Sequence, residues 1–528
     1  MSSIVRNKVG KYTYLYESES YRDKNGKPQT HKVSIGKLDP KTGEPIYKPE
    51  YLARVGGANR QTDLSNEKLY SENDIRNSQI REYGSFYLME AISNEIGLAD
   101  VLKSTLPERW EQVLMLAFYM ISSGEPAMYC EDWILRTESL PCGRMSSQDI
   151  SRLLSCISNA ERMAFFEQWG EVRNEREYLA LDITSISSYS EFIGDIEWGY
   201  NRDKERLAQI NVCMLLGEQS RLPVFQTTYR GSLKDVSTLK TTLQLASGLK
   251  LNNLSLVMDK GFCSKNNIDA MLEDKEGIRF LIAMPFTMAF AKNQTDSERE
   301  GIDSVDNTIV IGDDIIRGIT KERSWGQKHS LFTHVFFNAE LAYQTRNRLY
   351  GHVAKLKAEA MKDPASPKRT EEVDKYLTVR RSEKSASGYA VNIRHEVIES
   401  RLRLSGWLVI VSNHIVSAAE AIQIYRSKDV VEKGFLRMKN CLDLGRLRVH
   451  SDTHMQNKLF IGFVALIIMA HIHKVMSDNH MYEKMTLKKM LKTLERFRVQ
   501  YINGNKVLFP LTSDQKNIFS AFALPHPL

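Results

Sequence analysis

The sequence has few cysteines, and none are arranged to bind zinc. Six cysteines occur in 528 residues, with no C-x-x-C pair and no zinc-type spacing. We therefore expect no structural zinc and a reducing compartment. The chain also lacks a G-x-S-x-G motif and an H-E-x-x-H helix, which disfavours serine-hydrolase and zinc-protease chemistry.

Long apolar runs are missing as well. The longest run, Leu459–Ala470, has about a dozen residues, whereas a helix needs roughly 20 to cross a bilayer. This run is typical of a buried core helix, so no membrane association is expected. The first residues show no charged-then-apolar secretion signal, which favours a cytoplasmic protein.

The composition is that of a folded, globular protein. Hydrophobic residues make up 42% and charged residues 26% of the chain, which disfavours extensive disorder. The net charge is +7 and the pI about 8.8. This mild excess of positive charge permits a polyanionic partner without requiring one.

Two segments precede the central part of the chain. Alternating residues on both sides of Asn25-Gly26 predict a hairpin, and residues 1–83 are interpreted as a β-rich basic arm. Helical periodicity predicts a helical domain over residues 84–175 that could bind DNA. Within it, Ser147–Leu154 begins with a serine that could cap an amphipathic helix. A helix-turn-helix is one interpretation of this stretch, and an ordinary bundle helix is the other.

From residue 178 the pattern changes to short apolar runs separated by turns. The predicted elements are strands at 178–183, 210–216 and 222–228, a helix at 237–246, a strand at 254–258, a helix at 265–272 and a strand at 278–284. This β-β-β-α-β-α-β order predicts an α/β fold with a mixed sheet flanked by helices. Residues 176–285 are interpreted as the first part of this core.

The rhythm stops over residues 286–404, which we interpret as an inserted subdomain. Its basic residues could face DNA phosphates or form a solvated helix face. A strand at 407–411 and a long helix at 418–440 predict that the core resumes over 405–475. Residues 476–528 are predicted to be a C-terminal helical region, with a hairpin at Asn503-Gly504-Asn505.

Two acidic residues lie next to apolar runs of the predicted core. Asp182 is predicted to end the first strand, and Asp259 to follow the fourth, directly before Lys260-Gly261-Phe262. Burying a lone carboxylate is costly, so a metal, a hydrogen-bond network or a turn cap is needed to offset it. Ligands commonly bind at the strand ends of such sheets, which favours a functional role for these two acids.

A third acid lies on the predicted helix at 418–440. At 100° per residue, Tyr425, Lys428, Glu432 and Lys439 fall at about 0°, −60°, −20° and −40°, on one stripe. Such a stripe suits phosphodiester chemistry, because a carboxylate can bind metal while cations and a hydroxyl hold phosphates. The alternative is a solvated charged face with internal ion pairs.

These motifs resemble those of the bacterial insertion-sequence transposases of the DDE type. The helix fits the family pattern Y-x2-R-x3-E-x6-K, with Lys428 where the family has Arg, and Asp259-Lys260-Gly261-Phe262 resembles its D-x-G-F. The resemblance extends over residues 178–450. It implies an RNase H-like catalytic core with a long insertion, consistent with 77 positions from Asp182 to Asp259 and 173 from Asp259 to Glu432.

The resemblance also implies roles for single residues. Asp182, Asp259 and Glu432 would be the catalytic, metal-binding acids, and Tyr425, Lys428 and Lys439 would bind DNA phosphates. Three carboxylates suit two Mg²⁺ or Mn²⁺ ions.

The reaction implied is metal-dependent cleavage at insertion-sequence ends followed by strand transfer into target DNA. The partners would be double-stranded DNA, as terminal inverted repeats and as target, and a second copy forming a homodimer on DNA. Such a protein would work on the nucleoid in a bacterial cytoplasm.

Two other interpretations belong to different classes of function. One is a catalytically inactive, transposase-derived DNA-binding regulator, which the presence of all three acids disfavours. The other is an RNase H-like DNA nuclease without joining activity, which the sequence leaves open.

Overall fold

The computed structural model of the chain describes residues 2–10, 12–22, 27–40, 42–48, 51, 71–173, 177–248, 254–275, 277–364, 370–382 and 388–527. Internal contacts divide the chain into two compact units. One unit is Met1–Gln79 with Ile502–Asn505, and the other is Ile80–Tyr501 with Lys506–Leu528.

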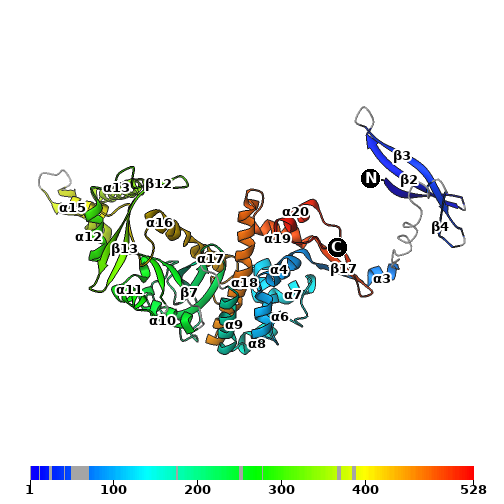
Figure 1. The fold of residues 1–528 in the computed structure, drawn as a ribbon, viewed down its shortest axis with the longest axis horizontal. Coiled ribbons are helices and arrows are strands. Elements are labelled where there is room, and N and C mark those ends of the chain that lie inside the picture. Colours follow the sequence, from blue (N-terminus) through cyan, green and yellow to red (C-terminus); the bar gives the residue numbers. More distant parts are fainter. Residues whose placement is uncertain are drawn as a thin grey trace. The chain divides into compact units, whose positions relative to one another are not determined.

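The first unit contains a four-stranded antiparallel sheet whose strands follow sequence order (Figure 1). The strands are β1 (Ser2–Val9), β2 (Tyr12–Arg22), β3 (Pro28–Leu38) and β4 (Pro45–Tyr47). β2 and β3 pair as far as Arg22 and Pro28, which confirms the strands of the predicted hairpin. Its Asn25-Gly26 turn lies outside the described residues.

The second unit begins with a helical part that packs around one long helix. Its helices are α4 (Gly84–Glu95), α5 (Leu98–Thr105), α6 (Trp110–Ser123), α7 (Cys130–Arg136), α8 (Ser147–Cys156) and α9 (Asn159–Val172). Ser146, one residue before the predicted cap, is the N-cap of α8. Its hydroxyl accepts the Asp149 backbone N–H, and the Asp149 carboxylate accepts the Ser146 backbone N–H.

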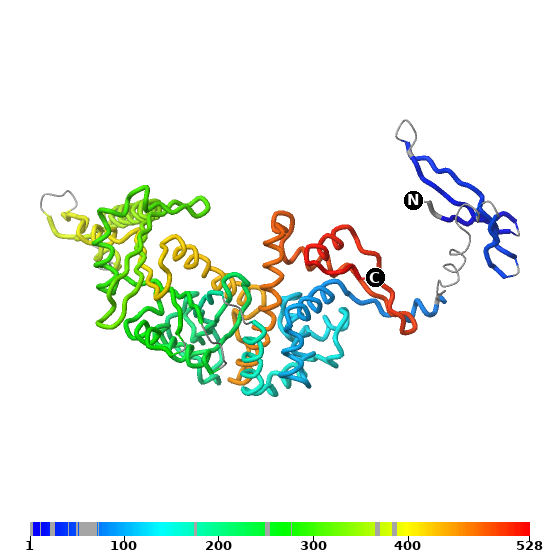
Figure 2. Tube along the Cα trace, viewed as in Figure 1, coloured from blue at the N-terminus to red at the C-terminus, as the bar shows by residue number. Residues whose placement is uncertain are grey.

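The long helix, α18 (Asp452–Asp478), contains the predicted apolar run and extends it at both ends. It contacts α6, α8 and α4 on one side and β8 and α17 on another, as the orange segment of the tube view shows (Figure 2). Among the described residues it is the helix with the length and hydropathy to cross a membrane, but 78% of its most apolar window is buried inside the protein. The predicted core helix is therefore confirmed, and it extends beyond the apolar run at both ends.

The centre of the second unit is a mixed nine-stranded sheet in the order β11-β12-β13-β16-β10-β9-β6-β7-β8. The strands are β6 (Tyr178–Ser187), β7 (Gln209–Gly217), β8 (Pro223–Arg230), β9 (Ser255–Met258), β10 (Arg279–Ala283), β11 (Thr308–Ile311), β12 (Asp314–Trp325), β13 (His329–Phe337) and β16 (Trp407–Ser412). β6, β9 and β10 run parallel, whereas the remaining neighbours pair antiparallel. This confirms the predicted mixed α/β architecture.

Helices cover both faces of this sheet (Figure 1). On one face lie α16 (Ala418–Ser427) and α17 (Asp429–Asn440), the latter with Gly434 against the Leu216 side chain. On the other face lie α10 (Asp235–Gly248) and α11 (Lys265–Leu272), where Thr242 contacts the Cys213 thiol of β7. Alternating residues of the strands therefore meet different helices.

Residues 286–404 contribute in two ways. β11, β12 and β13 extend the central sheet beyond β16, and α12 (Ala289–Glu298) packs beside them. Farther along, α13 (Ala339–Lys362), α14 (Glu371–Tyr376), α15 (His395–Leu402) and the hairpin of β14 (Leu377–Arg381) and β15 (Tyr389–Ile393) enclose a separate small core. Only this second portion lies apart from the sheet.

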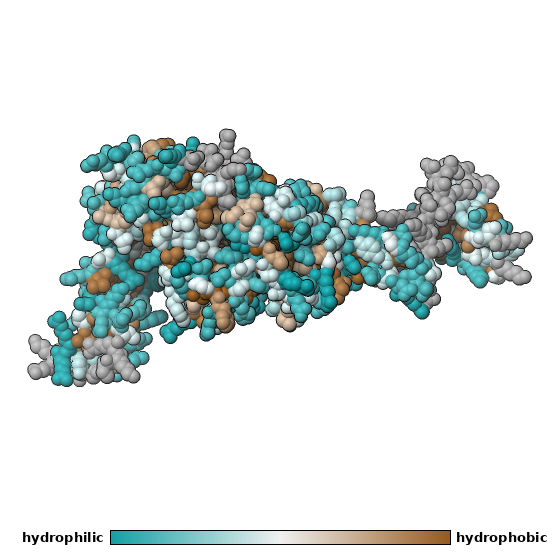
Figure 3. Space-filling model, turned by 90° about the horizontal axis from the view of Figure 1, so that it is seen from below, coloured by the Kyte–Doolittle hydropathy of each residue, from teal (hydrophilic) through white to brown (hydrophobic). Residues whose placement is uncertain are grey.

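The chain ends in small elements. α19 (Leu487–Glu495) precedes β17 (Arg498–Ile502) and β18 (Asn505–Leu508), which form a three-stranded sheet with β5 (Gln79–Glu82), and α20 (Ser513–Ala521) follows. The hairpin predicted at Asn503-Gly504-Asn505 is confirmed: Asn503 and Gly504, with positive φ angles of 49° and 77°, form its turn, and Asn505 begins β18. The visible face of the molecule carries apolar side chains in small patches among hydrophilic ones (Figure 3).

Candidate active site

The pairing of β6 with β9 brings two distant acids side by side. The strands run parallel with Leu181 opposite Met258, so Asp182 and Asp259 follow at neighbouring positions of adjacent strands. Adjacent strands lie about 4.8 Å apart, and residues in register point to the same face. That face is the one covered by α16 and α17.

Asp182 lies in the middle of β6, and the prediction that it ends the strand was wrong. The strand continues to Ser187 because its polar residues pair with β7 and are hydrogen-bonded. Ser185 donates to Asn211 Oδ1 at 3.2 Å, and Ser187 donates to Glu205 Oε2 at 2.5 Å. Asp259, in contrast, directly follows β9 as predicted and caps the short 3₁₀ turn Lys260–Phe262.

Burial makes the charge on Asp182 unfavourable. Burial, with a smaller contribution from the nearby charge of Asp259, raises the pKa of Asp182 from 3.8 to about 6. The Ile183 N–H, 2.7 Å from Asp182 Oδ1, and the positive charges of Arg202 and Lys428 act in the opposite direction. The pair of acids therefore forms a site with a strong demand for positive charge.

The predicted helix at 418–440 is interrupted at Lys428, which corrects the single-helix prediction. α16 ends at Ser427 and α17 begins at Asp429, and the Val431 N–H donates to the Lys428 carbonyl in a tighter, i to i+3 bond of 3.0 Å. The four residues of the predicted stripe are thus divided among α16, the junction and α17.

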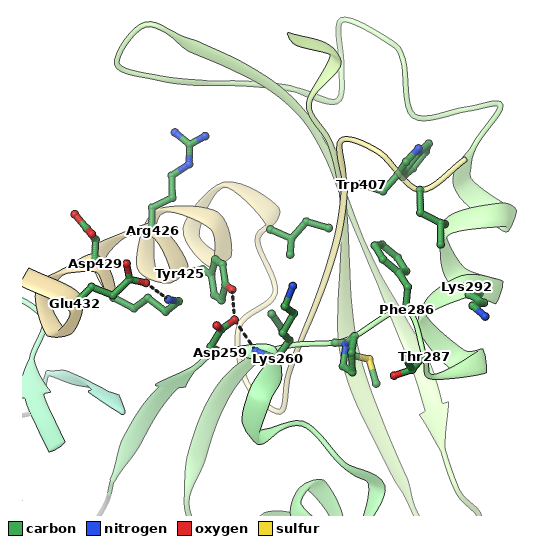
Figure 4. Close-up of a pocket in the computed structure, with 16 residues that line it drawn as sticks. Asp259, Lys260, Phe286, Thr287, Lys292, Trp407, Tyr425, Arg426, Asp429 and Glu432 are labelled. Carbon is green, nitrogen blue, oxygen red and sulfur yellow. Dashed lines mark hydrogen bonds and ion pairs between the residues drawn. The ribbon is translucent and has the colours of Figure 1, made fainter. Parts of the chain in front are cut away.

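Tyr425, at this junction, reaches the acid that follows β9 (Figure 4). The Tyr425 hydroxyl donates to Asp259 Oδ1 at 3.2 Å, and Lys428 Nζ lies 2.9 Å from Glu432 Oε1. Burial and then the charge of Asp259 raise the pKa of Tyr425, so its hydroxyl remains protonated and can donate. The junction therefore places a hydroxyl and an ammonium group above the acids.

Lys428 lies within the electrostatic field of all three acids. Burial favours its neutral form, but the hydrogen bond to Glu432 and the charges of Asp259, Glu432 and Asp182 outweigh burial and raise its pKa. Its side chain is only 10% exposed. One ammonium group thus compensates part of the negative charge of the site.

A cavity of about 850 Å³ opens in front of these residues. Its lining includes Asp259, Lys260, Tyr425, Arg426, Lys428, Asp429 and Glu432 on one side and Phe286, Thr287, Lys292 and Trp407 on the other (Figure 4). The mixture of acids, cations and aromatic rings is suited to a phosphate-containing ligand.

Lys439 points to a different place. Its ammonium group forms an ion pair of 2.6 Å with Asp203, in the loop between β6 and β7, and its side chain is 12% exposed. It is therefore not among the residues that line the cavity. The structure unites Asp182, Asp259, Tyr425, Lys428 and Glu432 and assigns Lys439 to the anchoring of that loop.

Two further residues support the acids and were not identified in the sequence. Arg202 forms a 2.5 Å ion pair with Asp235, and its charge lowers the pKa of Asp182. Asp235 opens α10 and approaches Gly261 so closely that a Cβ there would lie 2.9 Å from Asp235 Oδ2. In the sequence, Asp235 could have been found as an acidic residue at the start of a helix. Arg202 could not, because it lies in a loop without periodicity.

The three acids do not form a ready-made metal site. Among the described residues, no three Asp, Glu, His or Cys side chains are close enough together to hold a metal ion. Asp182 and Asp259 are neighbours, but the Glu432 carboxylate is turned to Lys428. The donor atoms are nevertheless all carboxylate oxygens, the type that Mg²⁺ and Mn²⁺ prefer.

Comparison with known families agrees with this geometry. The family model described as "Transposase DDE domain" matches residues 173–468, more than half of the chain. The chain belongs to this family. The DDE domain thus extends from just before β6 to α18 and includes Asp182, Asp259 and the α16–α17 junction.

Two other comparisons add less. A cryo-EM structure of a piggyBac transposase synaptic complex with hairpin DNA is similar at a TM-score of 0.34 and 11% sequence identity, covering 89% of this chain and 81% of that one. Similarity at this level does not establish a shared fold. No curated protein sequence matches the chain.

Proposed function

We propose that this DDE-domain protein cuts DNA at the ends of a mobile element and joins those ends to target DNA, in a reaction that requires Mg²⁺ or Mn²⁺. The observation that carries the proposal is the parallel register of β6 and β9, which sets Asp182 beside Asp259 under Tyr425 and Lys428. Family membership supports the same class of activity.

We further propose that the core is RNase H-like. Its first three strands, β6, β7 and β8, form an antiparallel meander, and β9 and β10 then continue the sheet parallel to β6 on its other side. This arrangement supports the proposal because it puts the first acid on a central strand and the second on that strand's neighbour.

Asp182, Asp259 and Glu432 are the residues that would hold the metal. A divalent ion bound there would supply a Lewis acid that polarises phosphate oxygens and lowers the pKa of water. To join the two aspartates, Glu432 would have to release Lys428. The freed Lys428 ammonium would then be a donor for a phosphate oxygen, and the Tyr425 hydroxyl would be a second one if it left Asp259.

The partners proposed are double-stranded DNA and a second copy of the chain. The cavity holds the scissile phosphate between α16–α17 and the sheet, and two protomers pair the two element ends as a homodimer on DNA. Sedimentation of paired-end complexes tests the dimer, and a complex with one protomer per two ends contradicts it.

The activity is tested with a supercoiled plasmid that carries the element's own ends, in the presence of Mg²⁺ or Mn²⁺. We expect Glu432→Gln to bind the ends without cutting, because it keeps the shape and removes the charge. Asp429→Asn is the matched control: it is also on α17, lines the same cavity and pairs with Lys433 instead of Lys428. It should cut like the unmodified protein.

The same experiment separates the alternatives. Linear product with no joining to target DNA identifies a nuclease, and binding without cutting by the unmodified protein identifies a regulator. Cutting by Glu432→Gln at the unmodified rate contradicts the role of Glu432.

A further inference from the structure

The loop between β6 and β7, residues 188–208, exposes an unusual number of aromatic side chains. Tyr189, Phe192, Trp198 and Tyr200 are 75%, 79%, 69% and 82% exposed, and no aromatic residue elsewhere in the described part of the chain exceeds 59%. An aromatic side chain can bury about 150–250 Å². A group of rings left in solvent at this density usually marks a binding surface.

The backbone of this aromatic loop is held firmly. Asn201 is buried, its side-chain nitrogen Nδ2 donates to Ser187 Oγ at 3.0 Å, and its side-chain oxygen Oδ1 accepts the backbone N–H groups of Asp203 and Glu205. Gly199 lies so close to Gly231 that an added Cβ would be 2.0 Å from its carbonyl oxygen. Trp198 and Tyr200 therefore project from a fixed point, and their exposure does not come from a loosely attached segment.

The aromatic loop is attached to the elements that carry the acids. It begins where β6, the strand of Asp182, ends, and its Asp203 pairs with Lys439 of α17 at 2.6 Å. Its Arg202 pairs with Asp235, which lies against Gly261, two residues after Asp259. Ser185, three residues after Asp182, lies 3.4 Å from the Tyr200 carbonyl oxygen and 3.5 Å from Arg202 Nη1, so the backbone that carries Tyr200 is held against the strand of the first acid.

The charges of the aromatic loop permit a nucleic acid to approach. Four of its five acidic residues are paired with cations, Asp195 and Glu197 with Arg230, Asp203 with Lys439 and Glu205 with Arg446. Lys204 and Arg206 are exposed. The acids that would otherwise repel phosphates are largely neutralised where the rings project.

We propose that the aromatic loop stacks unpaired bases of the DNA strand beside the scissile phosphate, with Trp198 and Tyr200 as the principal rings. This inference rests on the proposed function and adds a base-binding surface to it. Aromatic rings stack on any base, so this surface recognises strand separation and not sequence. It gives the enzyme a way to hold the DNA end open at the cleavage point.

The test measures affinity for two element-end duplexes in metal-free buffer, one fully paired and one with three unpaired nucleotides at the cleavage point. For Trp198→Ala/Tyr200→Ala we expect about tenfold or greater loss of affinity for the unpaired duplex, and less than about twofold for the paired one. 2-Aminopurine at an unpaired position should lose its quenching by the protein. Trp198→Phe/Tyr200→Phe should restore both readouts.

A matched control removes exposed rings elsewhere. Tyr343→Ala/Tyr350→Ala takes two side chains of α13, 59% and 51% exposed, and should leave the affinity difference unchanged. Tyr189 is kept, because the Arg446 guanidinium lies 5.7 Å from its ring centre and its loss would disturb the loop. Equal thermal midpoints of all variants show that folding is intact.

Three outcomes overturn the inference. The first is that Trp198→Ala/Tyr200→Ala keeps the affinity difference between the two duplexes. The second is that it loses affinity equally for both. In the third, the variant alters self-association in sedimentation but not DNA affinity, which makes the rings a protein interface. If the unmodified protein cuts element ends and any of these holds, only the aromatic-loop inference fails. If it neither binds nor cuts them, the proposed function fails.

Discussion

Replacing Asp182 by Asn should stabilise the protein and abolish DNA cleavage. The substitution removes a charge that is mostly buried, and the amide oxygen can still accept the Ile183 N–H that now lies 2.7 Å from Asp182 Oδ1. Replacing a carboxylate by an amide of the same shape raises stability where the folded protein pays to bury the charge. Such a buried charge is kept for function.

The magnitude follows from the pKa of Asp182, raised by burial from 3.8 to about 6. The folded state therefore binds the proton more tightly than the unfolded state. Its contribution to stability falls as pH rises from about 4 to about 6 and is lowest above pH 6. At neutral pH the ionised carboxylate costs at most about 3 kcal/mol. We expect Asp182→Asn to recover about 1–2 kcal/mol of this, since the amide is itself polar.

The assay is thermal or urea denaturation in EDTA, at neutral pH and at about pH 5. Asp182→Asn should be more stable than the unmodified protein at neutral pH, and the difference should shrink at low pH as Asp182 takes up its proton. Added Mg²⁺ should stabilise the unmodified protein and not the variant. Asp429→Asn, an exposed carboxylate at the same cavity, should change little.

The reasoning is refuted if Asp182→Asn is less stable than the unmodified protein in EDTA at neutral pH, or if Mg²⁺ stabilises both equally. The first result would mean that the carboxylate makes favourable contacts which outweigh its burial. The second would place the ion elsewhere.

Three further predictions concern the same site. Lys428→Met should lower, by about tenfold, the Mg²⁺ concentration that gives half of the Mg²⁺-induced rise in thermal midpoint. The reason is that a like charge a few ångströms from a bound cation costs on the order of 1 kcal/mol or more. An unchanged concentration means that Lys428 does not oppose the ion. Lys439→Met and Asp203→Asn should weaken binding to the unpaired duplex by similar, non-additive factors if Lys439 acts through the aromatic loop, whereas an effect of Lys439→Met alone would indicate a direct phosphate contact. Single-turnover cleavage should fall as pH drops through about 6, where Asp182 becomes protonated, and the midpoint should move lower with more Mg²⁺; a flat profile from pH 7 to 5 contradicts this.

Local patterns predicted the elements of the core but not their assembly. Alternation and apolar runs located β6 to β10, and Asp259 was placed correctly after β9, because a buried strand has a recognisable hydropathy. The adjacency of Asp182 and Asp259 depends on the β6–β9 register. Residues 77 positions apart in sequence give no local signal of such a pairing.

The errors have physical causes that hydropathy does not register. Thr184, Ser185 and Ser187 looked like the end of a strand, yet all three are buried in β6, where Ser185 donates to Asn211 and Ser187 to Glu205. The break at Lys428 contains no Pro or Gly. In the structure, Tyr425 before the break bonds to Asp259, and Glu432 after the break bonds to Lys428. These separate contacts account for the break. The aromatic loop was not predicted, because the exposure of Trp198 and Tyr200 depends on the contacts of Asn201 and Gly199.

The energetics of the site explain why a lysine at position 428 is workable. Asp182 and Asp259 repel each other, and the fold offsets this with one ammonium group that bonds Glu432 through a single contact of 2.9 Å. An arginine would hold the same carboxylate by two parallel bonds, which are harder to break. Under the proposed function, in which Glu432 leaves position 428 for a metal, the single contact of a lysine is the easier one to break. The same lysine would, under the proposed function, balance the charge before DNA binds and would donate to a phosphate afterwards.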